Sequence, residues 1–226
     1  SKEIEAFIIE LASGEISGDY KAFLQNSKTL IIDIPPKLRG ENPESFVEKI
    51  KTFVQKAVLN SSIENILFIS SSSVYGEEAI TITETTPEKP ETLSGKELLE
   101  TEHFLQQQTA FKTTILRFGG LIGGNRNPAK SLSGKSNIAT PQAPINLIHQ
   151  DDCIGIITAI IKQNYWNQKL NAAAPFHPTR KEYYTSKEQI LGLDLPQFEE
   201  NNASGKTIDS SKLSTALNYH FMHSEL

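Results

Sequence analysis

The run from Ile66 to Gly76, with the sequence ILFISSSSVYG, constrains the fold more than any other segment of the chain. The apolar residues from Ile66 to Ile69 are typical of a strand buried on both faces, and four serines follow directly. In an open parallel sheet, ligands bind just beyond the carboxyl ends of the strands. The serines therefore either belong to a binding site or satisfy backbone groups at an ordinary strand end. Taken alone, the run supports both interpretations equally.

Composition limits the classes of function that the chain can serve. With 226 residues, of which 38% are hydrophobic, it is long enough to bury a core. A net charge of -5, with lysines scattered among glutamates, gives no basic stripe, so we expect no nucleic-acid partner. No apolar segment approaches the roughly 20 residues of a membrane span, and we expect no membrane association. The single Cys153 cannot form an internal disulfide, which suits a cytoplasmic location.

Apolar strands alternate with amphipathic helices along the chain, and this alternation predicts an α/β fold with a doubly wound parallel sheet. The expected strands are 6–11, 29–34, 66–69, 113–118 and 170–173, and the expected helices are 44–59, 94–107 and 151–162. From Pro175 onward the pattern changes to short helices and polar turns. We therefore predict a main domain over residues 1–174 and a small C-terminal subdomain over residues 175–226.

Two sequence patterns resemble known binding motifs but lack a residue that each motif requires. The segments 134–136 and 205–207 resemble the end of a phosphate-binding loop, but Ala129 and Glu200 stand where that loop needs its leading glycine. His220 and His223 are close enough in sequence to share a metal ion, but no third ligand is spaced to match them. We accordingly expect neither a P-loop nor a metal site.

Further segments complete a larger pattern. They are Thr83-Glu84, Pro87, Pro90, the helix from Ser94, the segment 116–123 and the segment 148–152. In this order and at these separations, the chain resembles the extended short-chain dehydrogenase/reductase family, the NAD-dependent epimerase/dehydratase group. The resemblance covers nearly the whole chain. It implies a Rossmann-like sheet over residues 1–174, a substrate-side subdomain over 175–226, and NAD or NADP as cofactor. It also implies a small-molecule substrate, such as a sugar nucleotide or a similar hydroxyl or carbonyl compound.

The first departure from that family is the lack of a dinucleotide fingerprint. No Gly-x-Gly-x-x-Gly turn, which lets pyrophosphate approach a helix N-terminus, occurs anywhere in the sequence. The resemblance begins at what looks like the family's third strand, so the leading strand-helix-strand unit is missing from the sequence as given. We therefore expect the parent protein to be longer.

The second departure concerns the Tyr-x-x-x-Lys pair that members usually carry on the helix after the serine turn. Ser94 stands at the tyrosine position and Leu98 at the lysine position, and no other register restores the pair. A serine without a partner has too high a pKa to act as a general base near neutral pH. The usual hydride-transfer mechanism is therefore in doubt, and we expect Tyr75 to pack the turn rather than replace the missing acid.

The resemblance nevertheless assigns roles to several residues. Ser71 matches the hydroxyl that orients the reacting oxygen, and Ser94 is the second catalytic candidate. The expected cofactor-side residues are Pro35, Ser70, Phe118, Gly119 and Gly120, the two glycines letting the nicotinamide ring approach the backbone. Arg126 either binds an anionic part of the substrate or simply solvates its loop, and His149 either faces the substrate or caps the helix that follows it.

Two functions remain open on the sequence. The retained serine turn favours an enzyme of the epimerase/dehydratase type. The missing tyrosine and lysine favour a non-catalytic cofactor-binding regulator or scaffold that uses the same fold. The oligomeric state is also open, with a homodimer as one option.

Overall fold

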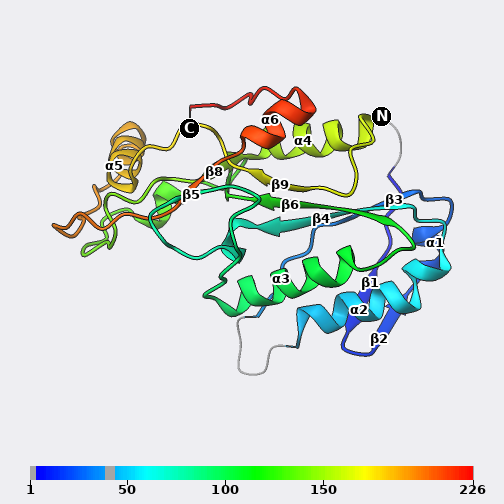
Figure 1. Ribbon diagram of the computed structural model, residues 1–226. Coiled ribbons are helices and arrows are strands. Elements are labelled where there is room, and N and C mark those ends of the chain that lie inside the picture. Colours follow the sequence, from blue (N-terminus) through cyan, green and yellow to red (C-terminus); the bar gives the residue numbers. More distant parts are fainter. Residues whose placement is uncertain (1–3, 39–43, 226) are drawn as a thin grey trace. The chain divides into compact units, whose positions relative to one another are not determined.

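The computed structural model describes residues 4–38 and 44–225 (Figure 1). Two compact units interleave along the chain. Unit 1 comprises Ser1–Val74, Glu88–Leu116 and Trp166–Lys169, and unit 2 comprises Tyr75–Pro87, Arg117–Tyr165 and Leu170–Leu226. The sequence-based division at residue 174 stays a prediction.

The main sheet has four strands in the order β3-β4-β6-β9. Their bounds are Thr29–Ile32 for β3, Asn65–Ser71 for β4, Lys112–Phe118 for β6 and Lys169–Ala172 for β9. Strand β3 runs parallel to β4, with Thr29 opposite Asn65 and Ile32 opposite Phe68. The predicted α/β class with a parallel sheet is confirmed.

The strand that opened the sequence argument is buried as expected. Ile66, Leu67 and Phe68 of β4 are completely inaccessible to solvent. A strand covered on both faces favours a continuous apolar run over an alternating pattern. The short 3-10 helix η2 (Ser72–Val74) follows β4 immediately.

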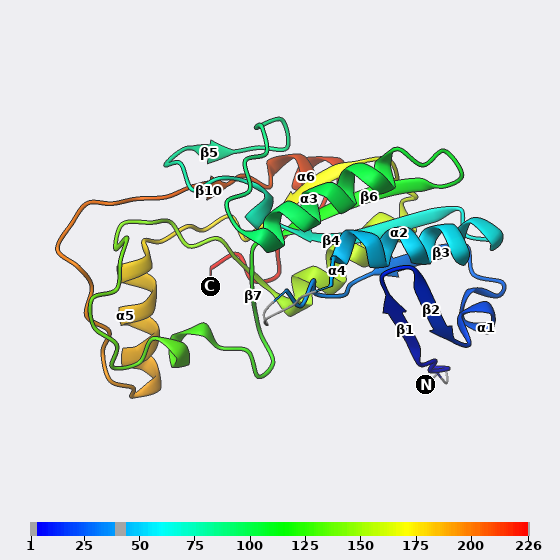
Figure 2. The same cartoon turned by 90° about the horizontal axis from the view of Figure 1, so that it is seen from below.

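Two helices of unit 1, α2 (Phe46–Lys56) and α3 (Leu93–Gln106), lie side by side against the sheet (Figures 1 and 2). The Ser45 hydroxyl caps α2 by accepting from the Glu48 backbone N–H. The Glu97 carboxylate of α3 accepts from the Val47 backbone N–H at 2.9 Å and from the Ser45 hydroxyl at 3.0 Å. A carboxylate at a helix N-terminus satisfies otherwise unpaired N–H groups, so Glu97 joins the two helices.

One sequence expectation for unit 1 was wrong. The segment 6–11 was expected to be a strand of the parallel sheet, but β1 (Ile9–Ala12) pairs antiparallel with β2 (Glu15–Gly18) in a separate two-stranded sheet. Gly14, with φ of +80°, closes the two-residue turn of this hairpin, a backbone conformation that glycine adopts without strain. The Gly14 N–H also donates to the Thr52 hydroxyl of α2 at 3.0 Å, which attaches the turn to that helix. Unit 1 is completed by α1 (Tyr20–Leu24) and the 3-10 helix η1 (Val58–Asn60).

Unit 2 contains two short parallel strand pairs. Strand β7 (Gly120–Ile122) pairs with β8 (Leu147–His149), and β5 (Thr81–Ile82) pairs with β10 (Thr207–Ile208). Its other elements are η3 (Pro128–Ser131), α4 (Gln150–Lys162), α5 (Arg180–Leu191) and α6 (Ser211–Leu217). Helix α5 begins with a capping box formed by Thr179 and Glu182.

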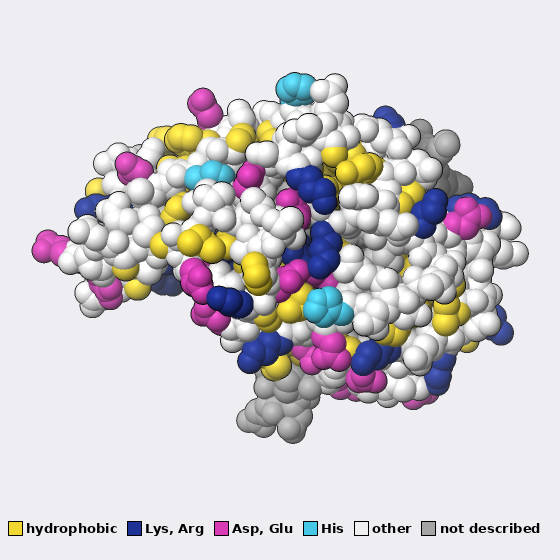
Figure 3. Space-filling model, viewed as in Figure 1, with side chains coloured by type: hydrophobic (Ala, Val, Ile, Leu, Met, Phe, Trp, Pro, Cys, Tyr) yellow, Lys and Arg dark blue, Asp and Glu magenta, His cyan; other side chains and the backbone are white. Residues whose placement is uncertain are grey.

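Acidic and basic side chains are intermixed on the face shown in Figure 3. Within residues 4–38 and 44–225, no helix combines the length and hydrophobicity that crossing a bilayer requires.

Candidate functional site

In unit 1, Ser71 ends strand β4 and lies half-buried at the carboxyl edge of the sheet. Its hydroxyl oxygen accepts a hydrogen bond from the Ser73 backbone N–H at 3.1 Å. A serine hydroxyl has one proton and two lone pairs, so this bond leaves the Ser71 proton available for another acceptor. Ser71 can therefore donate to a ligand oxygen while its own position is fixed by the turn.

Helix α3 begins against this turn, and Gly95 makes the close approach possible. A Cβ atom on Gly95 would lie 2.4 Å from the Ser73 carbonyl oxygen, which no side chain tolerates without movement. Ser94 precedes Gly95 in the first turn of α3 and is half-buried. Ser71 and Ser94 therefore flank the same junction between η2 and α3.

The position at which the family usually carries a lysine lies in the core of unit 1. The Leu98 side chain is 5% exposed on α3, and Leu105 of the same helix is fully buried. An apolar residue in this environment stabilises the helix packing, whereas a charged one would be desolvated. The face of α3 that carries Leu98 and Leu105 therefore packs in the hydrophobic core of unit 1.

Ser70 and Pro35, the two predicted cofactor-side residues of unit 1, differ in exposure. Ser70 is buried, and its hydroxyl donates to the buried Glu102 carboxylate of α3 at 2.5 Å. Pro35 is exposed three residues after the end of β3. Strands β3 and β4 are parallel neighbours, so their carboxyl ends lie at the same edge of the sheet. Pro35 comes just after the end of β3 and Ser71 ends β4, so both residues belong to this edge.

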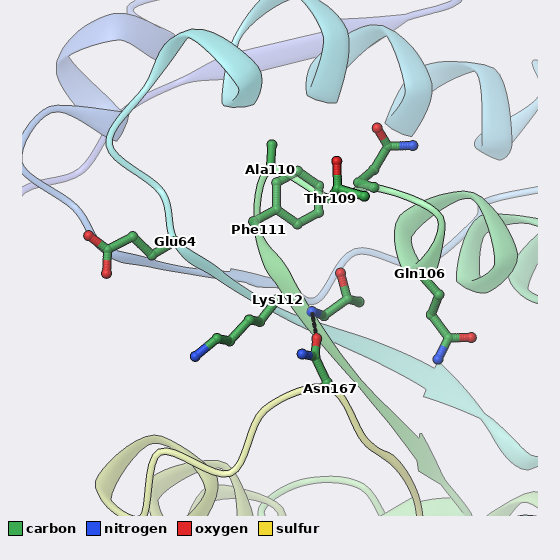
Figure 4. A pocket seen from close by; sticks show the side chains of 9 residues that line it. Glu64, Gln106, Thr109, Ala110, Phe111, Lys112 and Asn167 are labelled. Atoms are coloured by element: carbon green, nitrogen blue, oxygen red, sulfur yellow. Dashed lines mark hydrogen bonds between the residues drawn. The ribbon is translucent and has the colours of Figure 1, made fainter.

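A hollow of unit 1 lies at the other edge of the sheet. It has a volume of about 650 Å³ and is lined by Glu64, Gln106, Gln108, Thr109, Ala110, Phe111, Lys112, Thr113 and Asn167 (Figure 4). Lys112 begins β6, whereas Ser71 ends β4. The Asn167 side chain is already engaged there, accepting from the Thr113 backbone N–H at 3.1 Å (Figure 4). This hollow contains none of the predicted site residues.

In unit 2, the predicted glycines have a packing role. A Cβ atom on Gly119 would lie 2.5 Å from the Asn146 carbonyl oxygen, and one on Gly120 would lie 2.7 Å from Leu147 Cδ2. The Gly120 N–H also donates to the Asn146 carbonyl at 2.7 Å. The two glycines therefore allow β7 to approach β8, and Phe118 just before them is buried.

A buried polar network, which the sequence did not single out, surrounds Tyr75. The Arg117 guanidinium donates to the Tyr75 hydroxyl at 2.6 Å, and that hydroxyl donates to Asn171 Oδ1 at 2.9 Å. The Glu84 carboxylate accepts from the Asn171 backbone N–H at 2.8 Å. Burial raises the pKa of Tyr75, while the positive charge of Arg117 and its hydrogen bond act against this rise. The Tyr75 side chain is almost completely buried, and the expectation that it packs the turn stays a prediction.

A signal for this network was present in the sequence. Arg117 stands in the otherwise uncharged run 113–118, and an arginine in a buried strand needs hydrogen-bond partners. Its partner Tyr75 lies 42 residues away in sequence, so the run 113–118 alone could not identify it.

The predicted substrate residues of unit 2 lie near one another. Arg126 is exposed in a tight turn in which its backbone N–H donates to the Gly123 carbonyl at 3.0 Å. His149 is the N-cap of α4, its Nδ1 accepting from the Asp151 backbone N–H at 3.2 Å, so the capping role is confirmed. A Cβ atom on Gly123 would lie 2.7 Å from His149 Nε2, which places the turn over the imidazole edge.

The comparisons with known proteins give a sequence relative and a shared fold. No family model matches the chain. Protein YeeZ from Escherichia coli K12 is 33% identical over 202 residues, which cover 88% of this chain and 73% of that protein.

Two solved structures share the fold. The UDP-glucuronic acid 4-epimerase from Bacillus cereus, in complex with UDP-glucuronic acid and NAD, has a TM-score of 0.72 at 21% identity, covering 90% of this chain and 73% of its own. The UDP-N-acetylglucosamine 4-epimerase from the same organism has a TM-score of 0.71 at 19% identity, covering 90% and 75%. The expected Rossmann-like epimerase/dehydratase fold is thereby confirmed, and the chain belongs to the same family as Protein YeeZ.

Proposed function

We propose that the chain is an NAD(P)-binding protein of the epimerase/dehydratase type, with a sugar nucleotide or a similar hydroxyl or carbonyl compound as its substrate. The observation that carries the proposal is the Ser71 hydroxyl. It lies at the carboxyl end of β4, is held by the Ser73 N–H, and keeps its proton for a ligand. The fold is shared with epimerases whose structures contain NAD.

The residues of unit 1 suit the nicotinamide end of such a cofactor. Pro35 offers an exposed apolar surface without an N–H group, at the sheet edge where Ser71 lies. When bound, the nicotinamide supplies hydride chemistry, which amino-acid side chains cannot provide. Because the sequence has no Gly-x-Gly-x-x-Gly turn, the proposal assigns no residue of this chain to the pyrophosphate.

Other residues contribute to the proposal in different ways. Ser70 supports the site indirectly, since its hydroxyl binds Glu102 and thereby fixes the end of β4 against α3. Gly119 and Gly120 support a cofactor site less strongly. The space beside each glycine, where a side chain would lie, is already occupied by Asn146 and Leu147. Exposed Arg126 is the cation of unit 2 that we assign to a substrate phosphate.

Proton transfer is the step for which we name no side chain. Ser94 lies near the turn, but a serine hydroxyl needs an adjacent base to give up its proton, and the lysine position one turn later holds the buried Leu98. Ser71 therefore polarises and orients the reacting oxygen in this proposal. The burial of Leu98 is also the observation that favours the second function, a cofactor-binding regulator without turnover.

Saturation-transfer NMR on the 226-residue chain tests the proposal, because it detects weak ligands. We expect saturation to reach the nicotinamide protons of NAD or NADP, and to fall strongly in the Ser71→Ala variant. Ser186→Ala, on the exposed surface of α5, is the control and should leave the transfer unchanged. Absence of transfer to nicotinamide at millimolar cofactor would refute the proposal.

A second measurement separates the two functions. UDP-glucuronic acid and UDP-glucose are incubated with the chain and NAD, and the sugar protons are followed by NMR. Conversion that depends on Ser71 supports the enzyme. Nicotinamide contact without conversion of either sugar supports the regulator.

A further inference from the structure

Three donor side chains meet in unit 2 at the start of helix α4. The Asp151 carboxylate lies 3.3 Å from His149 Nδ1 and 3.0 Å from His223 Nε2. One donor atom from each residue falls within 4.8 Å of the other two. His149 ends β8 and Asp151 lies in the first turn of α4, which follows at once, whereas His223 comes after α6, so two segments distant in sequence contribute to this histidine–aspartate cluster.

The spacing of the donors matches that of ligands on a single metal ion. Metal–nitrogen and metal–oxygen bonds to zinc are about 2.0–2.2 Å, which puts two ligand atoms of a tetrahedral site about 3.3–3.6 Å apart. The two separations from the Asp151 carboxylate, 3.3 Å to His149 Nδ1 and 3.0 Å to His223 Nε2, are close to this range. The imidazole rings of His149 and His223 lie with their centroids 3.7 Å apart, so the two rings are in contact beside the Asp151 carboxylate.

The cluster is held in place by a neighbouring residue, Asp152. Its buried carboxylate accepts from the Met222 backbone N–H at 2.7 Å and the His223 backbone N–H at 3.1 Å. It also accepts from the Tyr219 hydroxyl at 2.9 Å. These three bonds fix the segment that carries His223 against α4, as Figure 1 shows for α4 and the red C-terminal segment. The donors are thus positioned by contacts outside the cluster.

The cluster is also open to solvent. The Asp151 side chain is 56% exposed and the His223 side chain 41% exposed, whereas His149 is mostly covered. An ion could therefore enter from water and complete its coordination with water molecules.

We propose that His149, Asp151 and His223 form a binding site for a divalent transition-metal ion of the zinc class. Two imidazoles and one carboxylate are a donor set that suits Zn²⁺, Co²⁺ or Ni²⁺ and disfavours Mg²⁺ and Ca²⁺, which take oxygen ligands. His149 Nδ1 donates its lone pair to the ion in place of the hydrogen bond that it accepts from the Asp151 N–H. Its Nε2 faces Gly123, which leaves Nδ1 as the coordinating atom.

The expectation of no metal site was based on pairing His223 with His220. His220 is exposed and stands outside the cluster. The partners of His223 lie 72 and 74 residues earlier, so spacing along the sequence could not reveal them.

Titration of the metal-stripped chain, freed of any purification tag, with CoCl₂ and ZnCl₂ tests this proposal. We expect one Co²⁺ per chain with micromolar affinity, a visible absorption band of four-coordinate cobalt, and displacement of the cobalt by Zn²⁺. Asp151→Asn and His223→Gln should each weaken binding at least about tenfold, because the first replaces an anionic ligand by a neutral amide and the second removes an imidazole ligand. His220→Gln, three residues from His223 and exposed, is the matched control and should bind like the parent chain.

Circular dichroism of each variant shows that the fold is retained. The proposal is overturned if the folded parent chain binds no stoichiometric metal, or if the Asp151→Asn and His223→Gln double variant binds as tightly as the parent. It is equally overturned if His220→Gln abolishes binding.

Discussion

The Arg117 guanidinium and the Tyr75 hydroxyl form a 2.6 Å hydrogen bond inside unit 2, with both side chains buried. The hydroxyl uses its own proton toward Asn171, so it is both an acceptor and a donor. The network therefore fixes the Tyr75 side chain within unit 2. The same arrangement makes Tyr75 unsuitable as the missing catalytic acid.

Replacement of Tyr75 by phenylalanine should lower the free energy of unfolding by at least about 2 kcal/mol. The variant leaves an Arg117 N–H and the Asn171 Oδ1 atom buried without the hydroxyl, and unpaired buried groups cost about 1–3 kcal/mol, more when charged. Urea unfolding followed by circular dichroism measures the change. Tyr20→Phe is the control, because Tyr20 is only half-buried, at the start of α1. Equal stability of the two variants would contradict the assigned role of the network.

Ser71→Ala should separate binding from stability. The Ser71 oxygen accepts one N–H bond from Ser73, so its loss should cost only about 1 kcal/mol of folding free energy. If the chain turns over a sugar nucleotide, loss of the donor to the reacting oxygen should lower kcat about 100-fold. A variant with unchanged turnover would place the reacting oxygen elsewhere.

Introducing the family's lysine should destabilise unit 1. In Leu98→Lys the ammonium group replaces a side chain that is only 5% exposed, and we expect a loss of about 3–5 kcal/mol. Leu93→Lys on the same helix is the matched control, since Leu93 is 54% exposed and its replacement should change stability by less than about 0.5 kcal/mol.

Restoring both members of the pair, as Ser94→Tyr with Leu98→Lys, should also give no gain in nicotinamide reduction. An absorbance assay with sugar-nucleotide substrates, together with thermal melts, checks this. A stable and newly active double variant would show that the cleft is still suited to hydride transfer.

Two glutamates of helix α5 should give opposite pH dependence of stability. Burial raises the pKa of Glu188 above its ordinary value of 4.5. Neither of its carboxylate oxygens has a hydrogen-bond partner among residues 4–38 and 44–225. Its contribution to stability is therefore full below pH 4.5 and is lost as the pH rises through the folded-state pKa. Glu188→Gln should remove this loss, making the variant more stable than the parent at neutral pH.

Glu182 is the internal control for this prediction. The Thr179 backbone N–H, followed by the Thr179 hydroxyl, holds the pKa of Glu182 below its ordinary value. Its contribution is present at neutral pH and is lost as the pH falls through the folded-state pKa. Glu182→Gln should be less stable than the parent at pH 7, with a difference that shrinks in acid. Thermal melts between pH 4 and 8 test both variants, and the same sign for the two would contradict the assignments.

The sequence predicted the elements that depend on local pattern. The apolar run at Ile66 forms β4, because a strand buried on both faces has a continuous apolar sequence. The segment around Phe53 forms α2, because a helix buried on one face has apolar residues at helical spacing. The hairpin at Gly14 was missed, because one glycine after a serine is a weaker turn signal than an Asn-Gly pair.

Long-range partners could not be predicted. Arg117 and Tyr75 are 42 residues apart, and nothing in either segment specifies the other. The family resemblance supplied Ser71 and Ser94, but only the structure showed that Gly95 brings the start of α3 against the turn and that the Leu98 position is core.

The dependence of Asp152 on Tyr219, Met222 and His223 has a consequence for how the protein is made. Its three partners are 67 to 71 residues further along the chain, so they are synthesised well after α4 itself. Until Tyr219, Met222 and His223 leave the ribosome, water must solvate the Asp152 carboxylate, and the start of α4 stays exposed to solvent. The start of α4 therefore reaches its native packing only after residues 219–223 have emerged, and a nascent chain stalled before Tyr219 exposes a surface on which chaperones can act.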